Sequence, residues 1–349
     1  MEAMIQKILI VHTWGLGDFI MFTPSLKVLR EHFPQARIDT FAPLAKGVLD
    51  ENSIVNTIFD FDWNKRHLFD KIKFIGKLRK EKYDAAIVTT STSTLKGGLF
   101  CLLIGAKMRV GEYRIIKSLF YTHQVKLDGN KHKIETNLHL LKMLGIKIDD
   151  STNRQQFFQF GDIDKEFAED FIRQNGLKDK MLIGFFPASA PQQQFKRWSV
   201  ENFVKLGELL LAQFPNSFIL LFGDNQEPIS GQIVGRFGAK GIHIAGLQLK
   251  KVVALMARCK VFVAADTGLG HIAATTNTNL VAIFGPTIPE RSGPVGNKVF
   301  IIQEKCRYRY HDVFTRKYDT TKDHQCLKKI TPAMVFDKVM DIISRKNDQ

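Results

Sequence analysis

The sequence has few cysteines and no long apolar run. Cysteines at CxxC or CxxH spacing are absent, so we expect free thiols in a reducing compartment, with local pairing of Cys306 and Cys326 as the alternative. No stretch reaches the roughly 18 uninterrupted apolar residues of a membrane span. The opening apolar run is short, is interrupted by Gly17 and Asp18, and has no small-residue cleavage site after it. These absences predict a cytoplasmic protein. The four cysteines are Cys101, Cys259, Cys306 and Cys326.

The sequence also has fewer acidic than basic residues. The chain has 35 Asp and Glu against 50 Lys and Arg, which gives a formal net charge of +15. Such a surface should attract polyanions, namely nucleic acid, anionic lipid headgroups or phosphorylated glycans. No recognition-helix, RNP or zinc-finger signature accompanies the charge, which argues against nucleic acid as the partner. A hydrophobic content of 44% and a charged content of 24% are typical of a globular enzyme.

Strand-like and helix-like segments alternate in two series, and 349 residues suffice for two domains of ordinary size. In the first series, a buried strand over 7–13, a helix that starts at Pro24 and a strand over 36–43 predict a βαβ unit. The second series begins near Met181. The weakly patterned stretch 147–162 lies between them. The sequence therefore predicts an α/β protein with two doubly wound, Rossmann-like domains, 1–160 and 161–349, which face each other across a cleft.

Two late strands each end in a polar loop. The apolar strand 261–265 is followed by Asp266, a small-residue turn and a helix start, and the strand from Leu280 is followed by a Gly-Pro loop. Ligands of open α/β sheets bind at the carboxyl edge, where helix N-termini present unpaired backbone N–H groups. We therefore expect an anion, most simply a phosphate, at these loops. The backbone of Thr267, Gly268 and Leu269 would cradle it, and His271 would supplement the cradle.

The first loop, WGLGD at residues 14–18, lacks part of a dinucleotide-binding fingerprint. Ile20 occupies the position of the third glycine of GxGxxG, so nicotinamide binding is weakly supported. The loop instead places Asp18 at a glycine turn, where the chain can approach a substrate closely. Such a carboxylate suits a general base. Asp18 could equally cap the following helix, and the spacing does not decide between the two.

Charged residues stand at two further strand ends of the second series. Lys196 and Arg197 lie just before a helix with Ser199 as its expected N-cap, and two cations beside exposed N–H groups suit a pyrophosphate. In the loop 221–227, Asp224 and Glu227 could accept hydrogen bonds from ribose hydroxyls. Asp224 and Glu227 could equally be solvent-facing loop acids. A lone Lys-Arg pair is usually an ordinary surface pair, but the place of Lys196 and Arg197 at the carboxyl edge of a sheet favours the anion site.

Residues 65–82 form a basic segment with eight Lys or Arg against two acids. Leu68, Ile72, Ile75 and Leu78 fall at helical spacing, which predicts one apolar face packed on the domain. The segment could be an ordinary surface helix. Alternatively, the cations Lys65, Arg66, Arg109 and Arg114 bind the carboxylates and phosphates of an anionic acceptor.

Together these blocks resemble a known family. Gly17-Asp18 followed by TPSLKVLREHFPQARIDTFAP, then FKRW, ADTGLGHIAA, FGPTIPERSGPVG and the late ITPAMVFDKVMDII are similar, in order, to the ADP-heptose:lipopolysaccharide heptosyltransferases of glycosyltransferase family 9. The resemblance implies a GT-B fold and an inverting transfer of heptose from an ADP-sugar that needs neither metal nor cofactor. It places the acceptor site in the N-terminal domain and the donor site in the C-terminal domain, which ends in a closing helix.

Carried to this chain, the resemblance assigns roles to the candidate residues. Asp18, with Gly17 beside it, would remove the proton of the acceptor hydroxyl, and Lys196 would bind the departing pyrophosphate at the cradle 267–269. Asp266 would contact the sugar or organise its loop, Glu227 would hold the ribose, and His271 would support the phosphate loop. The acceptor would be an inner-core lipopolysaccharide, an anionic glycolipid at the inner membrane surface, and the enzyme would be peripheral to that membrane.

Two other functions fit the same sequence. One is a GT-B transferase or epimerase that uses a UDP- or GDP-linked sugar. The other is a non-catalytic module that uses the basic helix to dock on membranes or nucleic acid.

Overall fold

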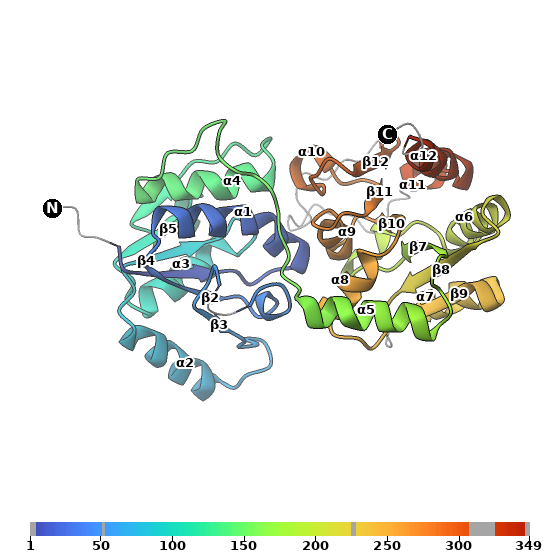
Figure 1. The fold of residues 1–349 in the computed structure, drawn as a ribbon. Coiled ribbons are helices and arrows are strands. Elements are labelled where there is room, and N and C mark those ends of the chain that lie inside the picture. Colours follow the sequence, from blue (N-terminus) through green and yellow to red (C-terminus); the bar gives the residue numbers. More distant parts are fainter. Residues whose placement is uncertain (1–4, 51–52, 225–227, 307–324, 346–349) are drawn as a thin grey trace. The chain divides into compact units, whose positions relative to one another are not determined.

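The computed structural model describes residues 5–50, 53–224, 228–306 and 325–345, and the chain divides into two compact units, residues 1–159 and 160–349 (Figure 1). Each unit contains a six-stranded sheet in which every pairing between neighbouring strands is parallel. The predicted α/β architecture with two doubly wound sheets is therefore confirmed.

Unit 1 has the strand order β3-β2-β1-β4-β5-β6. The order reverses next to β1, which is the topological switch point where such sheets bind ligands. Its elements are β1 (Lys7–Val11), α1 (Leu16–His32), β2 (Arg37–Phe41), η1 (Ala45–Gly47), β3 (Thr57–Phe59), α2 (Leu68–Lys80), β4 (Ala85–Val88), α3 (Thr94–Leu103), β5 (Met108–Glu112), η2 (Ile115–Ser118), β6 (His123–Val125), α4 (Lys133–Leu141) and η3 (Lys142–Leu144).

The two faces of this sheet are covered by different helices. Helices α1 and α4 pack against each other. On the opposite face, α2 and α3 pack on the sheet through an aromatic cluster, in which the ring of Phe74 stacks on Phe61 at 4.2 Å and lies 5.3 Å from Phe41. The buried side of α2 is thus formed by Phe74 and Leu78.

The first helix of unit 1 differs from the prediction. It begins at Leu16 rather than Pro24, and Pro24 lies inside it. Proline has no N–H, so it cannot bond the carbonyl of Ile20 one turn back. The hydroxyl of Thr23 donates to that carbonyl at 2.8 Å instead, and this local replacement lets the helix run through the proline. Asp18 consequently sits in the first turn of a long helix.

Unit 2 repeats the pattern with the order β12-β11-β10-β7-β8-β9. Its elements are α5 (Asp162–Gln174), β7 (Met181–Phe186), η4 (Pro191–Lys196), α6 (Val200–Gln213), β8 (Ser217–Phe222), α7 (Pro228–Val234), η5 (Gly235–Lys240), β9 (Gly241–Ile244), α8 (Leu249–Met256), β10 (Val261–Ala265), α9 (Gly268–Ala273), β11 (Asn279–Phe284), α10 (Pro289–Ser292), β12 (Val299–Gln303), α11 (Gln325–Lys329) and α12 (Pro332–Ser344).

The core of unit 2 fixes the loop that carries Lys196. Helices α6 and α12 pack together on one face of the sheet. Trp198, which lies between Lys196 and α6 in the sequence, is buried. Its indole N–H donates to the carbonyl of Ile330 just before α12. Ser199 caps α6 by accepting from the backbone N–H of Asn202 at 3.1 Å, as predicted. Two independent hydrogen bonds, one of Trp198 and one of Ser199, therefore fix the chain directly after Lys196.

None of the helices in the described ranges is both long enough and apolar enough to span a membrane. Cys101 and Cys259 are buried free thiols, as expected. Cys306 and Cys326, whose pairing was the alternative, lie with their sulfur atoms 2.7 Å apart. Burial, followed by contact with Cys306, raises the pKa of the Cys326 thiol to about 12.

Candidate functional site

Asp18 lies at the carboxyl edge of the unit 1 sheet, in the first turn of α1. The N-cap of this helix is Gly15, so Asp18 is not the capping residue that the sequence left open. Its carboxylate instead accepts hydrogen bonds from two side chains of other elements. The Ser91 hydroxyl, in the loop after β4, donates to Oδ1 at 2.6 Å, and the Lys133 ammonium, at the start of α4, donates to the same oxygen at 2.5 Å.

The electrostatics of this cluster keep Asp18 ionised. Its side chain is only 16% exposed, and that of Lys133 is 26% exposed. Burial by itself raises the pKa of the Asp18 carboxyl, but the charge and hydrogen bond of Lys133 and the hydrogen bond from Ser91 outweigh it and hold the pKa below its ordinary value. An ionised, oriented carboxylate at a sheet edge can accept a proton from a substrate hydroxyl.

A buried histidine supports the turn in front of Asp18. His12 ends the β1 region, and burial lowers its pKa to about 4, although the charge of Asp18 opposes this, so the ring is neutral at pH 7. Its Nε2 lies 3.3 Å from the carbonyl of Gly15, which can only accept, so Nε2 carries the proton. The Nδ1 atom then accepts from the Thr89 hydroxyl at 2.9 Å. His12 thereby ties the N-cap of α1 to the loop after β4.

Lys133 and Ser91 were missed by the sequence analysis. Ser91 stands in a run of Thr and Ser that has no specific pattern, and Lys133 is 115 residues from Asp18. The one local signal is electrostatic. A cation in the first turn of a helix opposes the helix dipole, so Lys133 is unfavourable at the start of α4 unless a nearby anion compensates.

At the carboxyl edge of the unit 2 sheet, a buried ion pair joins two predicted residues. The Lys196 ammonium, at the end of η4, lies 2.8 Å from Oδ2 of Asp266, which follows β10. The side chains are 9% and 7% exposed. The Thr287 hydroxyl, after β11, donates to the same oxygen at 2.7 Å. Three loops of one edge are therefore tied together at Asp266.

The predicted phosphate cradle forms the start of α9. Thr267 is the N-cap and its hydroxyl accepts from the N–H of Gly270 at 3.4 Å. Gly268 and Leu269 occupy the first turn and are partly exposed. His271 is buried within the same helix. An ammonium has three donors, so the pairing of Lys196 with Asp266 leaves it able to contact a phosphate at this turn.

Arg197 supports the turn that follows β7. Its Nε donates to the hydroxyl and its terminal nitrogen to the carbonyl of Ser189, each at 3.0 Å. The guanidinium thus stabilises the loop 187–190. Asp224 is exposed at the end of β8, and Glu227 lies outside the described residues, so a ribose contact by Glu227 stays a prediction.

The four cations predicted for the acceptor do not lie at one end of the sheet. Lys65 and Arg66 follow β3 and Arg114 follows β5, so these three share the carboxyl edge with Asp18. Arg66 lies over the ring of Phe61 at 5.8 Å. Arg109 lies near the amino end of β5, where its guanidinium donates to the carbonyls of residues 106 and 120. Its expected acceptor contact is therefore not supported by its position. Gly17 is buried beside Asp18.

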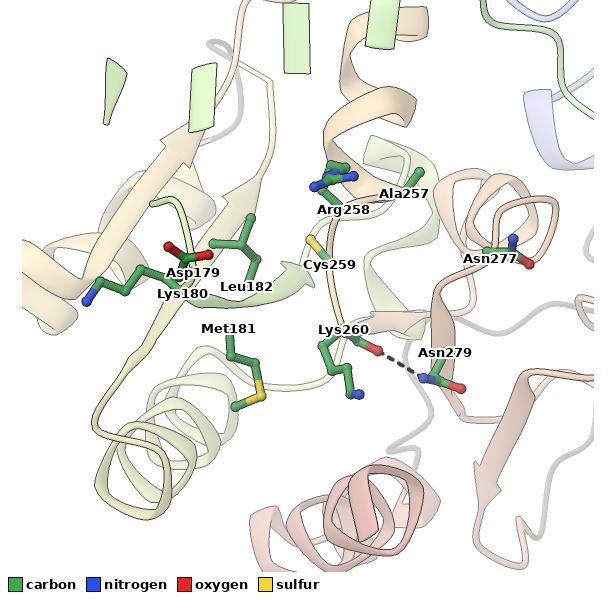
Figure 2. A pocket seen from close by; sticks show the side chains of 10 residues that line it. All are labelled: Asp179, Lys180, Met181, Leu182, Ala257, Arg258, Cys259, Lys260, Asn277 and Asn279. Carbon is green, nitrogen blue, oxygen red and sulfur yellow. Dashed lines mark hydrogen bonds between the residues drawn. The ribbon is translucent and has the colours of Figure 1, made fainter. Parts of the chain in front are cut away.

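A hollow in unit 2, with a volume of about 590 Å³, lies elsewhere (Figure 2). It is lined by the starts of β7 and β11 and by the residues before β10, where the amide of Asn279 donates to the carbonyl of Lys260 at 2.9 Å. Asp266 follows the far end of β10. The hollow is therefore at the amino edge of the sheet, opposite the edge where ligands of such sheets bind.

Across the ranges that the structure describes, no three His, Cys, Asp or Glu side chains gather in a way that could hold a metal ion. Each carboxyl edge carries an ion pair, Asp18–Lys133 in unit 1 and Lys196–Asp266 in unit 2.

Two Rossmann-like units, each with a six-stranded parallel sheet, are the architecture of the GT-B fold. A sequence profile of glycosyltransferase family 9 (heptosyltransferase) matches residues 71–318, more than half of the chain. The chain belongs to this family and is a glycosyltransferase, so the alternative of a non-catalytic module is wrong.

Relatives match over nearly the full length. Lipooligosaccharide heptosyltransferase 2 of Haemophilus influenzae is 27% identical, with 97% of this chain and 100% of that protein covered. The solved E. coli ADP-heptose lps heptosyltransferase II is 25% identical with a TM-score of 0.79, and 98% and 100% of the two chains are covered. A glycosyl transferase family 9 structure from Veillonella parvula has a TM-score of 0.80 at 23% identity, with 99% of each chain covered.

Proposed function

We propose that this protein transfers heptose from ADP-heptose to an inner-core lipopolysaccharide acceptor of the lipid A–Kdo type, with inversion at the anomeric carbon. The observation that carries the proposal is Asp18, an ionised carboxylate held by Lys133 and Ser91 at the carboxyl edge of unit 1. The names of the relatives, a lipooligosaccharide heptosyltransferase and an ADP-heptose lps heptosyltransferase, supply the substrate classes.

In the proposed reaction, Asp18 takes the proton of the acceptor hydroxyl while that oxygen forms a bond to the anomeric carbon. The bond from that carbon to the diphosphate oxygen breaks, and ADP leaves with the electron pair. Lys133 and Ser91 keep the base ionised and oriented, which supports general-base catalysis worth about 10²–10⁴-fold. The low pKa weakens the base, so positioning matters more than basicity.

On the donor side, the developing negative charge needs fixed positive groups. We assign Lys196 to the departing diphosphate, together with the backbone N–H groups at the start of α9. Asp266 and Thr287 hold Lys196 in place, and Arg197 holds the adjacent turn. Because the ammonium is anchored before the donor binds, it needs little reorganisation as the bond breaks.

On the acceptor side, Lys65, Arg66 and Arg114 share the edge that carries Asp18. We assign them to the carboxylates and phosphates of the anionic acceptor. An acceptor of this kind is a glycolipid, so we place the enzyme in the cytoplasm, at the inner surface of the membrane that carries it.

A ligand panel tests the donor assignment. Thermal unfolding of the full chain is measured with ADP, UDP, GDP and NAD, each in large excess. A ligand at about 100 times its Kd stabilises the native state by about 2.7 kcal/mol, which shifts Tm visibly. We expect stabilisation by ADP alone, and mass-spectrometric detection of heptose added to the acceptor when ADP-heptose is supplied. Selective stabilisation by UDP or GDP would refute the ADP-heptose assignment.

A further inference from the structure

Exposed apolar side chains gather on three elements of unit 1. Among its described residues, unit 2 exposes four large apolar side chains, on α5, on β12, before β12 and on α12. Single exposures of this kind are normal, but a contiguous group indicates an interaction surface. In unit 1 the exposed residues of α2, α3 and η2 are Leu68, Phe69, Ile72, Leu95, Leu99, Leu102, Leu103, Ile115, Ile116 and Leu119, the last of which directly follows η2.

These elements form one layer on one face of the unit 1 sheet. The inward side chains of α2 and α3, among them Phe74, Leu78 and Phe100, belong to a single core cluster, which also contains Tyr121 just after η2. Helix α3 contacts both α2 and η2. Because the three elements share one buried side, their outward side chains share the opposite side. We call this surface the α2–α3–η2 face.

The first turn of α2 shows that this exposure is not incidental. The spacing of the sequence predicted that Leu68 and Ile72 pack on the domain, but they are 73% and 59% exposed, and Phe69 is 76% exposed. The prediction is wrong because Phe74 stacks on Phe61 and sets the rotation of the helix. Nothing in the described part of unit 1 covers these three side chains.

The exposed apolar residues are surrounded by cations. Helix α2 carries five Lys or Arg against the single acid Asp70. Lys65 and Arg66 precede it, and Lys96 is exposed on α3. An apolar stripe on a strongly basic helix is typical of helices that lie in the interface of an anionic bilayer, where lysines meet headgroups and apolar side chains enter the acyl boundary. The charge of this face is complementary to such a surface.

We propose that the α2–α3–η2 face is a docking surface for a bilayer of anionic phospholipid. Leu68, Phe69 and Ile72 of α2 enter the headgroup–acyl boundary together with Ile115 and Ile116. Helices in parallel sheets start at the carboxyl edge, so these residues lie at the same edge of unit 1 as Asp18. Docking therefore brings the proposed base close to a membrane-embedded acceptor. The inference rests on the proposed function for this acceptor, but the surface itself does not.

The test is flotation of the full-length protein with two kinds of vesicle, phosphatidylcholine alone and phosphatidylcholine mixed with phosphatidylglycerol. We expect binding to the anionic vesicles only. The double variant Phe69→Ser/Ile116→Ser should reduce the bound fraction at least tenfold. The matched control Ile163→Ser/Met334→Ser, which removes two exposed apolar residues of unit 2, should bind like the wild type. Unchanged Tm shows that both variants fold.

Further outcomes separate docking from catalysis. Transfer to a delipidated oligosaccharide acceptor should survive in Phe69→Ser/Ile116→Ser, whereas transfer to a vesicle-embedded acceptor should fall. If the double variant binds anionic vesicles as the wild type does, docking is overturned and the transferase proposal stands. If the wild type binds anionic vesicles but does not use ADP-heptose, the docking proposal stands and the transferase proposal is overturned. A wild-type dimer that the double variant converts to monomer, without vesicle binding, would make this face a self-association surface and overturn the proposal.

Discussion

At the scale of single residues, both proposed sites contain a charged pair before any substrate arrives. Asp18 is held by Lys133, and Lys196 is held by Asp266. Removing charges from water is costly, and such pairs contribute more to fixed geometry than to net stability. Fixed geometry is what a proton acceptor and a leaving-group clamp require. The pairs also make the roles of the four residues separable by substitution.

Lys133→Met should raise the pKa of Asp18, because the charge and hydrogen bond of Lys133 lower it. A base works only above its pKa, so the acidic limb of the kcat/KM profile should move to higher pH. In the wild type, the lowered pKa of Asp18 stabilises the fold at neutral pH, and this contribution disappears as the pH falls through the folded pKa. The free energy of unfolding of Lys133→Met at neutral pH should lack this contribution. The exposed Lys131→Met is the control. An acidic limb that does not move would contradict the role of Lys133.

Lys196→Met should leave Asp266 buried without its cation. We expect a loss of about 3–5 kcal/mol in the free energy of unfolding, measured with urea. The double variant Lys196→Met/Asp266→Asn should recover most of this stability, since neither charge remains. Both variants should lose affinity for ADP in calorimetry. If the double variant binds ADP like the wild type, Lys196 does not hold the diphosphate.

At the scale of elements, the sequence predicts strands better than helix orientation. Apolar runs such as 7–11 and 261–265 mark buried parallel strands, and the polar residues after them mark the carboxyl edge. The rotation of α2 was not predictable from its own spacing, because Phe74 is turned inward by rings that come from other elements. The start of α1 was missed because the Thr23 hydroxyl compensates for Pro24. Lys133 was not predicted because it is far from Asp18 in the sequence and comes close to it only in the folded sheet.

Two glycines in helices should respond oppositely to alanine. A Cβ at Gly76 in α2 meets nothing within 4 Å, so Gly76→Ala should stabilise the protein by about 0.5–1 kcal/mol through helix propensity. A Cβ at Gly207 in α6 would lie 2.3 Å from the ring of Phe237, a buried residue. Gly207→Ala should therefore destabilise the fold despite the same gain in propensity, by about 1–3 kcal/mol. Equal effects on urea unfolding would contradict this packing.

At the scale of the whole molecule, two units of the same design carry different chemistry. Unit 1 holds the proposed base and the cations for an anionic acceptor, and unit 2 holds the proposed clamp for the diphosphate. The net charge of +15 suits anionic partners of both kinds. This division predicts that a substitution in the proposed site of one unit leaves ligand binding by the other unit unchanged.

The most direct test of the account is Asp18→Asn, which removes the proposed base and keeps the shape of the side chain. Heptose transfer is measured with ADP-heptose and a lipopolysaccharide acceptor, and the Kd of ADP is measured in parallel, with the exposed Asp128→Asn as the control. We predict that kcat falls about 10²–10⁴-fold in Asp18→Asn while the Kd of ADP is unchanged. Full turnover by Asp18→Asn would contradict the central claim that Asp18 is the general base.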